Sequence, residues 1–267
     1  MANYSAQDVK KLREDTDAPM MECKAALDES EGDFDKAKNI LREKGKAAAA
    51  KRSDRSTAAG VVAIASSEDG KTVGAIVLES ETDFVARNED FIAIAQGLAE
   101  IYRDNEVVDP AKVKEIVEAA VGKIRENIKL SKGVRFTSAN PIATYVHHDK
   151  TKGSVVTSEG AVSDAVHKVA VQVVAFPPDV LKKEDLSQDK LDQEIEIETQ
   201  RAINEGKDEN LARNIAKGRV NKEFIKRAVL VEQPYYVDPS KSVAQFLAEE
   251  AKGTQLTGFA YLAVGQA

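Results

Sequence analysis

The sequence predicts an α+β multidomain protein. Its expected parts are an N-terminal three-helix bundle, a core of two related α+β subdomains, and an inserted antiparallel helical hairpin. Apolar residues recur at helical spacing in the first 45 residues, alternate at strand spacing in two later regions, and form two narrow stripes nearer the C-terminal end. The 267 residues are enough for two or three units with their own cores.

Residues 1–45 are expected to form the bundle. Pro19 suits the first turn of the second helix and Asp33 can cap the third, which Gly45 is expected to end. Residues 46–58 are rich in alanine and positive charge, which predicts a helical extension that runs into a linker. A patch that meets an acidic partner is the alternative for this segment.

Residues 59–140 are expected to form the first core subdomain. Two alternating segments flank Asp69-Gly70, a strong signal for a hairpin turn, and a periodic helix carrying Phe91 follows. Residues 108–130 predict one long helix with Ile128 on its apolar face, and the next strand is expected to begin at VRFTS.

Residues 141–186 and 230–267 are expected to form the second core subdomain, because strand, turn, strand and helix recur there. The segment 254–264 predicts a buried strand that completes the second sheet. Residues 187–229 would then be a helical hairpin inserted into this subdomain. The hairpin's narrow stripe is typical of a two-helix antiparallel coiled coil, and its oppositely charged arms favour pairing. The stripe comprises Leu186, Leu191, Ile195 and Ala202 on one arm and Leu211, Ile215, Val220, Phe224 and Ala228 on the other.

Composition argues against several classes of protein. No apolar run reaches about 18 residues, so no transmembrane helix is expected. The N-terminus shows no targeting segment, and the single cysteine, Cys23, fits a reducing compartment, so we expect a cytoplasmic protein. Cys23 lies among apolar residues and is expected to be an inert buried thiol. The net charge of −7 argues against a general nucleic-acid binder.

No pattern of catalytic or metal-binding residues is evident. Phosphate-binding glycine loops and Cys-x-x-Cys pairs are missing from the sequence, and the histidines are His147, His148 and His167 only. His147 and His148 are expected to point to opposite sides of a strand, which disfavours a shared metal. One of the two is a candidate surface contact. We therefore expect no enzyme activity, no cofactor and no metal.

The segment SETDFVARNEDF, residues 80–91, is the candidate functional site. Asp83 and Phe84 lie at the junction between a strand and a helix, where a loop can present side chains outward. The corresponding segment of the second subdomain, residues 158–160, is short and polar. Periodicity alone favours Phe84 as a plug of the local core, since buried phenylalanine is common. A wedge aimed at a partner protein is the alternative.

Four stretches carry a resemblance to a known family. They are VKKLREDTDAPMMECKAALDESEGDFDKA, ETDFVARNEDF, GRVNKEF and GFAYLAVGQA. Along its whole length the sequence resembles the bacterial translation elongation factor Ts family, the guanine-nucleotide exchange factors of elongation factor Tu. The resemblance implies a ubiquitin-associated (UBA)-like bundle, two related core subdomains and a coiled-coil hairpin. It also implies a role in protein biosynthesis.

The resemblance also implies how the site works. The turn Thr82, Asp83, Phe84 and Val85 would dock on the nucleotide-binding domain of elongation factor Tu. Phe84 would insert near the magnesium site, and Asp83 would position the turn. GDP would then lose the partners that neutralise its charge. Weaker partner contacts implied in the same way are Met20, Met21, His147, Tyr236 and Val237.

Some points stay open at this stage. Asp17 and Pro19 replace the usual glycines before the methionines, which is expected to alter that turn. His148 and the turn after it differ from commoner sequences, so the assignment of His147 as a contact stays open. Some members have a further C-terminal helix, whose contacts are expected to be absent here. The expected partner is elongation factor Tu, in a 1:1 or a 2:2 complex, with no direct nucleic acid and no membrane. A binding adaptor with the hairpin as its arm is a second hypothesis, and an RNA-associated translation protein is a third, which the acidic balance opposes.

Overall fold

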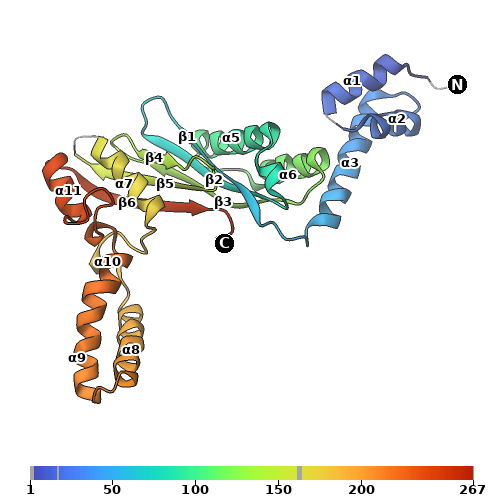
Figure 1. The fold of residues 1–267 in the computed structure, drawn as a ribbon. Helices are drawn as coiled ribbons and strands as arrows, with labels where there is room; N and C mark the ends of the chain where they lie inside the picture. Colours follow the sequence, from blue (N-terminus) through green and yellow to red (C-terminus); the bar gives the residue numbers. More distant parts are fainter. Residues whose placement is uncertain (1–2, 17, 161–163, 267) are drawn as a thin grey trace. The chain divides into compact units, whose positions relative to one another are not determined.

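The computed structural model describes residues 3–16, 18–160 and 164–266. Among them it places helices together with two three-stranded sheets, which agrees with the predicted α+β class (Figure 1). No helix in these ranges combines the length and the apolar character that crossing a bilayer requires.

The chain divides into two compact units, each with its own core. The first unit takes the residues up to Ala65, Gly74–Arg135 and those from Ala263 onward, and the second takes Ser66–Val73 and Phe136–Leu262. The five-part division expected from the sequence remains a prediction.

The first unit begins with three helices, α1 (Ala6–Thr16), α2 (Met20–Glu29) and α3 (Phe34–Arg52). The Asp33 carboxylate accepts from the Lys36 N–H and caps α3 as expected. The prediction that Gly45 ends α3 was wrong, because α3 continues to Arg52. One glycine costs a helix only about 1 kcal/mol, and the alanines that follow are strong helix formers. The buried core of these helices comprises Val9, Leu12, Cys23, Ala26, Leu27, Ala37 and Leu41.

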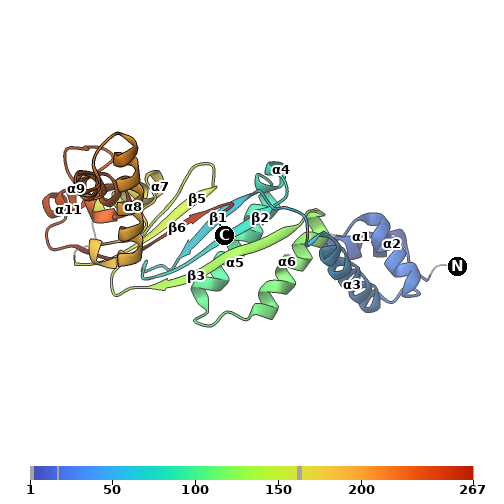
Figure 2. The same ribbon diagram turned by 90° about the horizontal axis from the view of Figure 1, so that it is seen from below.

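The first unit continues with a sheet of order β1-β2-β3 and three helices. These elements are β1 (Ala59–Ser66), β2 (Thr72–Ser80), α4 (Asp83–Ala86), α5 (Glu89–Asp104), α6 (Pro110–Ile124) and β3 (Ile128–Thr137). Strand residues Ile76 and Leu78 pack against Phe91 and Leu98 of α5. Gly74 permits this close packing, because a Cβ there would lie 2.0 Å from the Ala99 carbonyl oxygen. Figure 2 shows α4 standing out beyond the end of β2.

The predicted helix over 108–130 was too long. It ends at Ile124, because Arg125 adopts a left-handed conformation with φ 69° and its N–H bonds to the Val121 carbonyl. Ile128 is therefore the first residue of β3, six residues before the strand start that the sequence predicted. This correction places Glu126 and Asn127 in the connection between helix and strand.

The second unit contains the sheet β4-β5-β6. Its elements are β4 (Ala143–Val146), β5 (Lys152–Glu159), α7 (Asp164–Ala175), α11 (Val243–Glu250), β6 (Gln255–Ala263) and short 3-10 turns at Lys183–Asp185 and Leu230–Glu232. Strands β4 and β5 pair antiparallel with Thr144 opposite Val155. The expected strand over 254–264 is confirmed as β6, which completes this sheet. The expected helix after β5 is also confirmed, as α7.

A helical hairpin separates α7 from α11 along the chain. It comprises α8 (Gln188–Asn204), α9 (Glu209–Arg219), a π-helical turn (Val220–Phe224) and α10 (Ile225–Ala228). Helices α8 and α9 lie side by side (Figure 1).

The predicted apolar stripe of this hairpin is confirmed at Leu186, Ala202, Val220, Phe224 and Ala228, which are buried. Leu211 is 47% exposed, so its place in the buried stripe was wrong. Small residues are the buried ones on α8 and α9 themselves. The buried residues are Thr199 and Ala202 on α8 and Ala212 and Ala216 on α9.

Candidate functional site

The candidate site is the turn that leaves strand β2. Thr82 is extended and its side chain accepts from the Val85 N–H at 3.4 Å, which starts the single turn α4. Asn88 follows and caps α5 by accepting from the Asp90 N–H at 2.8 Å. Two caps a few residues apart thus hold the turn between a buried strand and a buried helix.

Phe84 lies on α4 with 83% of its surface exposed, so it does not plug the core. Val85 and Ala86 pack against the core of the first unit instead. Covering a phenylalanine side chain from water is worth about 1.5–3 kcal/mol, which is available to a molecule that binds over Phe84.

Asp83 is exposed beside Phe84. It forms an ion pair with Arg87 at 3.0 Å, one turn along the chain. Exposed pairs of this kind contribute at most about 1 kcal/mol, so the pair can be exchanged for contacts with a partner.

Glu126 holds the start of α4, and the sequence reasoning missed it. One of its oxygens accepts from the Thr82 N–H at 3.0 Å and the other from the Thr82 hydroxyl at 2.6 Å. The Ser80 hydroxyl donates to the Thr82 carbonyl at 3.1 Å. The sequence signal for Glu126 was hidden, because the expected helix ran through it.

The other expected contact residues of the first unit are exposed. Met20 and Met21 are 43% and 72% exposed at the start of α2, a helix that buries Cys23, Ala26 and Leu27. Pro19 is the residue before this helix, and Asp17 lies outside the described residues.

In the second unit, His147 is half-buried just after β4. The Tyr145 hydroxyl lies 3.0 Å from His147 Nδ1, and the rings of His147 and His148 are 4.3 Å apart. The expectation that these two histidines point apart was wrong, because β4 already ends at Val146. Within the described ranges, no three side chains of the metal-binding types converge on one point.

Tyr236 and Val237, also in the second unit, are 36% and 64% exposed. The Tyr236 N–H donates to the buried side chain of Gln172 at 2.8 Å, which fixes this segment. Phe176 is 56% exposed, and its carbonyl accepts from the side chain of Gln233, to which the Gln172 side chain donates. The sequence reasoning did not single out Phe176.

The predicted residues thus fall into two groups. The first unit carries Thr82 to Val85 on one turn and the two methionines on α2; the second carries His147 and the Tyr236-Val237 segment on separate connections.

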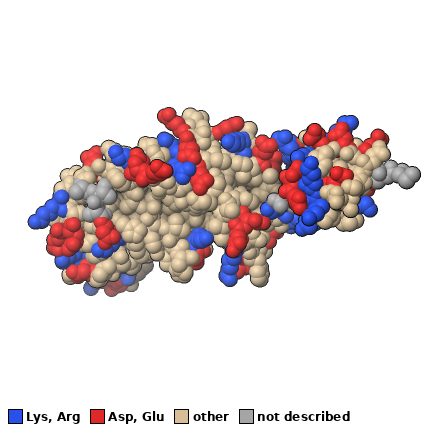
Figure 3. Space-filling model, turned by 90° about the horizontal axis from the view of Figure 1, so that it is seen from above, with Lys and Arg blue, Asp and Glu red and all other residues tan. Residues whose placement is uncertain are grey.

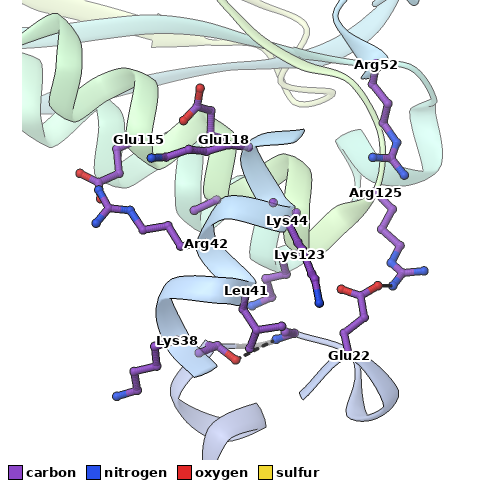
Figure 4. A pocket seen from close by; sticks show the side chains of 16 residues that line it. Glu22, Lys38, Leu41, Arg42, Lys44, Arg52, Glu115, Glu118, Lys123 and Arg125 are labelled. Atoms are coloured by element: carbon purple, nitrogen blue, oxygen red, sulfur yellow. Dashed lines mark hydrogen bonds and ion pairs between the residues drawn. The ribbon is translucent and has the colours of Figure 1, made fainter. Parts of the chain in front are cut away.

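A charged cleft of about 340 Å³ lies in the first unit between α3 and α6 (Figure 4). Arg42 pairs with Glu115 at 2.5 Å, and Arg125 pairs with Glu22. Figure 3 likewise shows acidic and basic side chains interspersed over the helical N-terminal part. Small-molecule sites are mostly apolar with a few convergent polar groups, so this cleft of paired charges is better described as a seam between helices.

Cys23 is fully buried in the bundle. Burial raises the pKa of its thiol, although a contact with the Thr16 hydroxyl acts in the opposite direction. Because the thiolate is the reactive form, Cys23 is poorly suited to be a nucleophile.

Comparisons with known proteins place the chain in a family. Residues 81–266 match the family model described as Elongation factor TS. Elongation factor Ts of Corynebacterium kroppenstedtii is 39% identical, with all of both chains covered. Elongation factor Ts of Clostridium botulinum (strain Alaska E43) is 38% identical over 93% of this chain and 87% of the relative, and that of Aquifex aeolicus is 35% identical over 98% of each. The match spans the exposed turn, the second unit and nearly all of the sequence, and the chain belongs to the elongation factor Ts family.

Proposed function

We propose that this protein is the guanine-nucleotide exchange factor of elongation factor Tu in translation elongation. The observation that carries the proposal is the exposed ring of Phe84 on a turn held by caps and by Glu126. A large apolar side chain on a rigid base fits a wedge, because little conformational entropy is lost when it binds. Membership of the elongation factor Ts family supports the same function.

In the proposed mechanism, the turn Thr82 to Val85 docks on the nucleotide-binding domain of elongation factor Tu. Phe84 inserts near the magnesium site, and Asp83 exchanges its exposed pair with Arg87 for contacts with the partner. Displacing the elements that hold Mg²⁺ and the β-phosphate removes the charge neutralisation of GDP, so GDP leaves and GTP can bind. No covalent step is involved. Linkage requires that GDP weaken binding of the exchange factor by the same ratio.

Further contacts are proposed at Met20, Met21, His147, Tyr236 and Val237. All five are exposed or half-exposed in their own units. We also propose that the first three helices form a UBA-like bundle, that the hairpin is a coiled coil, and that the protein acts in the cytoplasm.

The test of this function is release of fluorescent GDP from elongation factor Tu. Catalytic amounts of the protein are expected to speed release, with turnover of many GTPase molecules per molecule of factor. Release at the unassisted rate would contradict the proposal.

A second candidate role is an adaptor that uses the hairpin as its arm. Ile197 and Leu211 support it, because they are 60% and 47% exposed on the hairpin. Deleting residues 187–229 is expected to leave catalysed GDP release unchanged and to abolish binding of the protein that the hairpin would recruit. Loss of GDP release in that variant would contradict a separate adaptor role.

A further inference from the structure

Asn127 ties the linker after α3 to the segment that leads into α4. Its side-chain amide donates to the carbonyls of Ser53 and Arg55, at 3.3 and 2.7 Å. Its backbone N–H donates to the Glu81 carboxylate at 2.6 Å. Asn127 is 8% exposed, so these bonds are partly shielded from water.

Glu81 closes this network from the other side. The Arg55 guanidinium lies 3.4 Å from the Glu81 carboxylate, which also accepts from Asn127. Three segments therefore meet at the Glu81 carboxylate: the linker after α3, the end of β2, and the connection between α6 and β3. Glu126, the residue before Asn127, accepts hydrogen bonds from Thr82 through both of its carboxylate oxygens.

Two consecutive side chains thus hold two segments that are remote in the sequence. The left-handed conformation of Arg125 ends α6 and places Glu126 and Asn127 between the linker and the turn. Neither segment has regular hydrogen bonding of its own at these positions, and fixing each residue's backbone costs about 1–2 kcal/mol. Side chains that bond to both segments offset that cost before any partner binds.

We propose that Glu126 and Asn127 are a positioning pair, which holds Phe84 ready for insertion and couples its position to the linker of the helical bundle. The part that concerns exchange rests on the function proposed above. The part that concerns order in the free protein does not. Residues 53–57 are then an ordered connection rather than a flexible linker. A displacement of the bundle therefore also displaces the turn.

The first test compares Glu126→Ala with Glu126→Gln. Glutamine can keep both contacts, because its oxygen accepts from the Thr82 N–H and its NH2 group donates to the Thr82 hydroxyl. We expect Glu126→Ala to lower the maximal rate of GDP release about tenfold, as loss of bonds to a charged group predicts, with a smaller change in the half-saturating concentration. Glu126→Gln is expected to stay within about threefold of wild type. Glu106→Ala is the matched control, since Glu106 is an exposed acid of the same unit.

The second test is hydrogen exchange of the free, full-length protein. The amides of Ala86, Arg87 and Asn88 are bonded within α4 and report on its order. Glu126→Ala is expected to speed their exchange while the amides of α5 keep theirs. Asn127→Ala is expected to speed exchange both at Arg55 and at these three amides.

Several results would overturn the proposal. If Glu126→Ala releases GDP and exchanges its amide hydrogens at wild-type rates, Glu126 has no positioning role. Equal losses in Glu126→Ala and Glu126→Gln with a lowered unfolding temperature would assign Glu126 to general stability. Faster exchange at Arg55 alone in Asn127→Ala would disprove the coupling. If the wild-type protein does not speed GDP release but the exchange pattern is as expected, the proposed function fails and the ordering role stands.

Discussion

The side-chain amide of Gln172 donates to that of Gln233 at 2.9 Å, inside the second unit. The two side chains are 0% and 3% exposed. Gln172 also bonds to the Pro234 carbonyl and to the Tyr236 N–H, while Gln233 donates to the carbonyls of Phe176 and Arg227. The pair therefore joins the end of α7, the end of α10 and the segment that presents Tyr236.

This network predicts a large effect of removing one amide. Gln233→Met is expected to destabilise the second unit by about 2–4 kcal/mol, because the buried Gln172 amide loses its acceptor and the carbonyls of Phe176 and Arg227 lose their donors. Urea unfolding followed by hydrogen exchange of α7 measures this change. In the double variant with Gln172→Met, the cost should be smaller than the sum of the single costs. Strict additivity would show that the two amides act independently.

The buried alanines of the hairpin predict that enlarging Ala212 costs more stability than truncating Leu211. Ala212→Leu is expected to cost about 1–3 kcal/mol, because the larger side chain overpacks a fully buried position. Leu211→Ala, at the exposed neighbouring position, is expected to stay within about 0.5 kcal/mol of wild type. Thermal unfolding of both variants measures these costs. A larger cost for Leu211→Ala than for Ala212→Leu would show that Leu211 belongs to the buried stripe, as the sequence predicted.

Arg219 predicts a pH-dependent contribution to the hairpin. Its guanidinium bonds to Glu205 at 2.7 Å, and this hydrogen bond lowers the pKa of Glu205 below its ordinary value. Because the folded pKa is below the unfolded one, the contribution is fully present above the unfolded pKa, about 4.3, and is lost as pH falls through the folded pKa.

The measurement is the stability difference between wild type and Arg219→Ala at neutral pH and near pH 3. The difference is expected to be present at neutral pH and to shrink in acid, and salt should weaken it throughout. Arg213→Ala, which removes an exposed cation of the same helix, is the control. An equal difference at both pH values would contradict the role of Glu205.

The buried thiol of Cys23 predicts slow chemical labelling. A disulfide reagent is expected to react with the native protein far more slowly than with the unfolded chain, since burial raises the pKa of the thiol. Absorbance of the released thiolate gives both rates. Labelling of the native protein at the rate of a free cysteine would show that the bundle opens readily.

Much of the secondary structure followed from local rules in the sequence. Asp33 has the capping role that its position predicted, and the period of α5 gave its buried face, including Phe91. The strand β6 was predictable because a compact apolar segment followed a helix.

Other features depended on conformations or contacts that periodicity does not encode. The end of α6 depends on a left-handed Arg125, a conformation that is uncommon in non-glycine residues. The large apolar residues of the hairpin predicted its buried part near the base, but they missed the buried small residues Thr199, Ala212 and Ala216. Glu126 acts on Thr82 across 44 positions, a contact that only the folded chain creates. For Phe84, periodicity alone favoured the wrong environment, and the family resemblance favoured the exposed one that the structure has.

Phe84→Ala tests the central claim most directly. Because Phe84 is 83% exposed, its removal is expected to leave thermal stability within about 0.5 kcal/mol of wild type. Loss of a buried ring at an interface costs at least about 2 kcal/mol, so catalysed GDP release should fall about thirtyfold or more. Val107→Ala, which removes another exposed apolar side chain of the same unit, should change neither quantity. Unchanged GDP release in Phe84→Ala, or a stability loss of about 3–5 kcal/mol as for a core phenylalanine, would contradict the account.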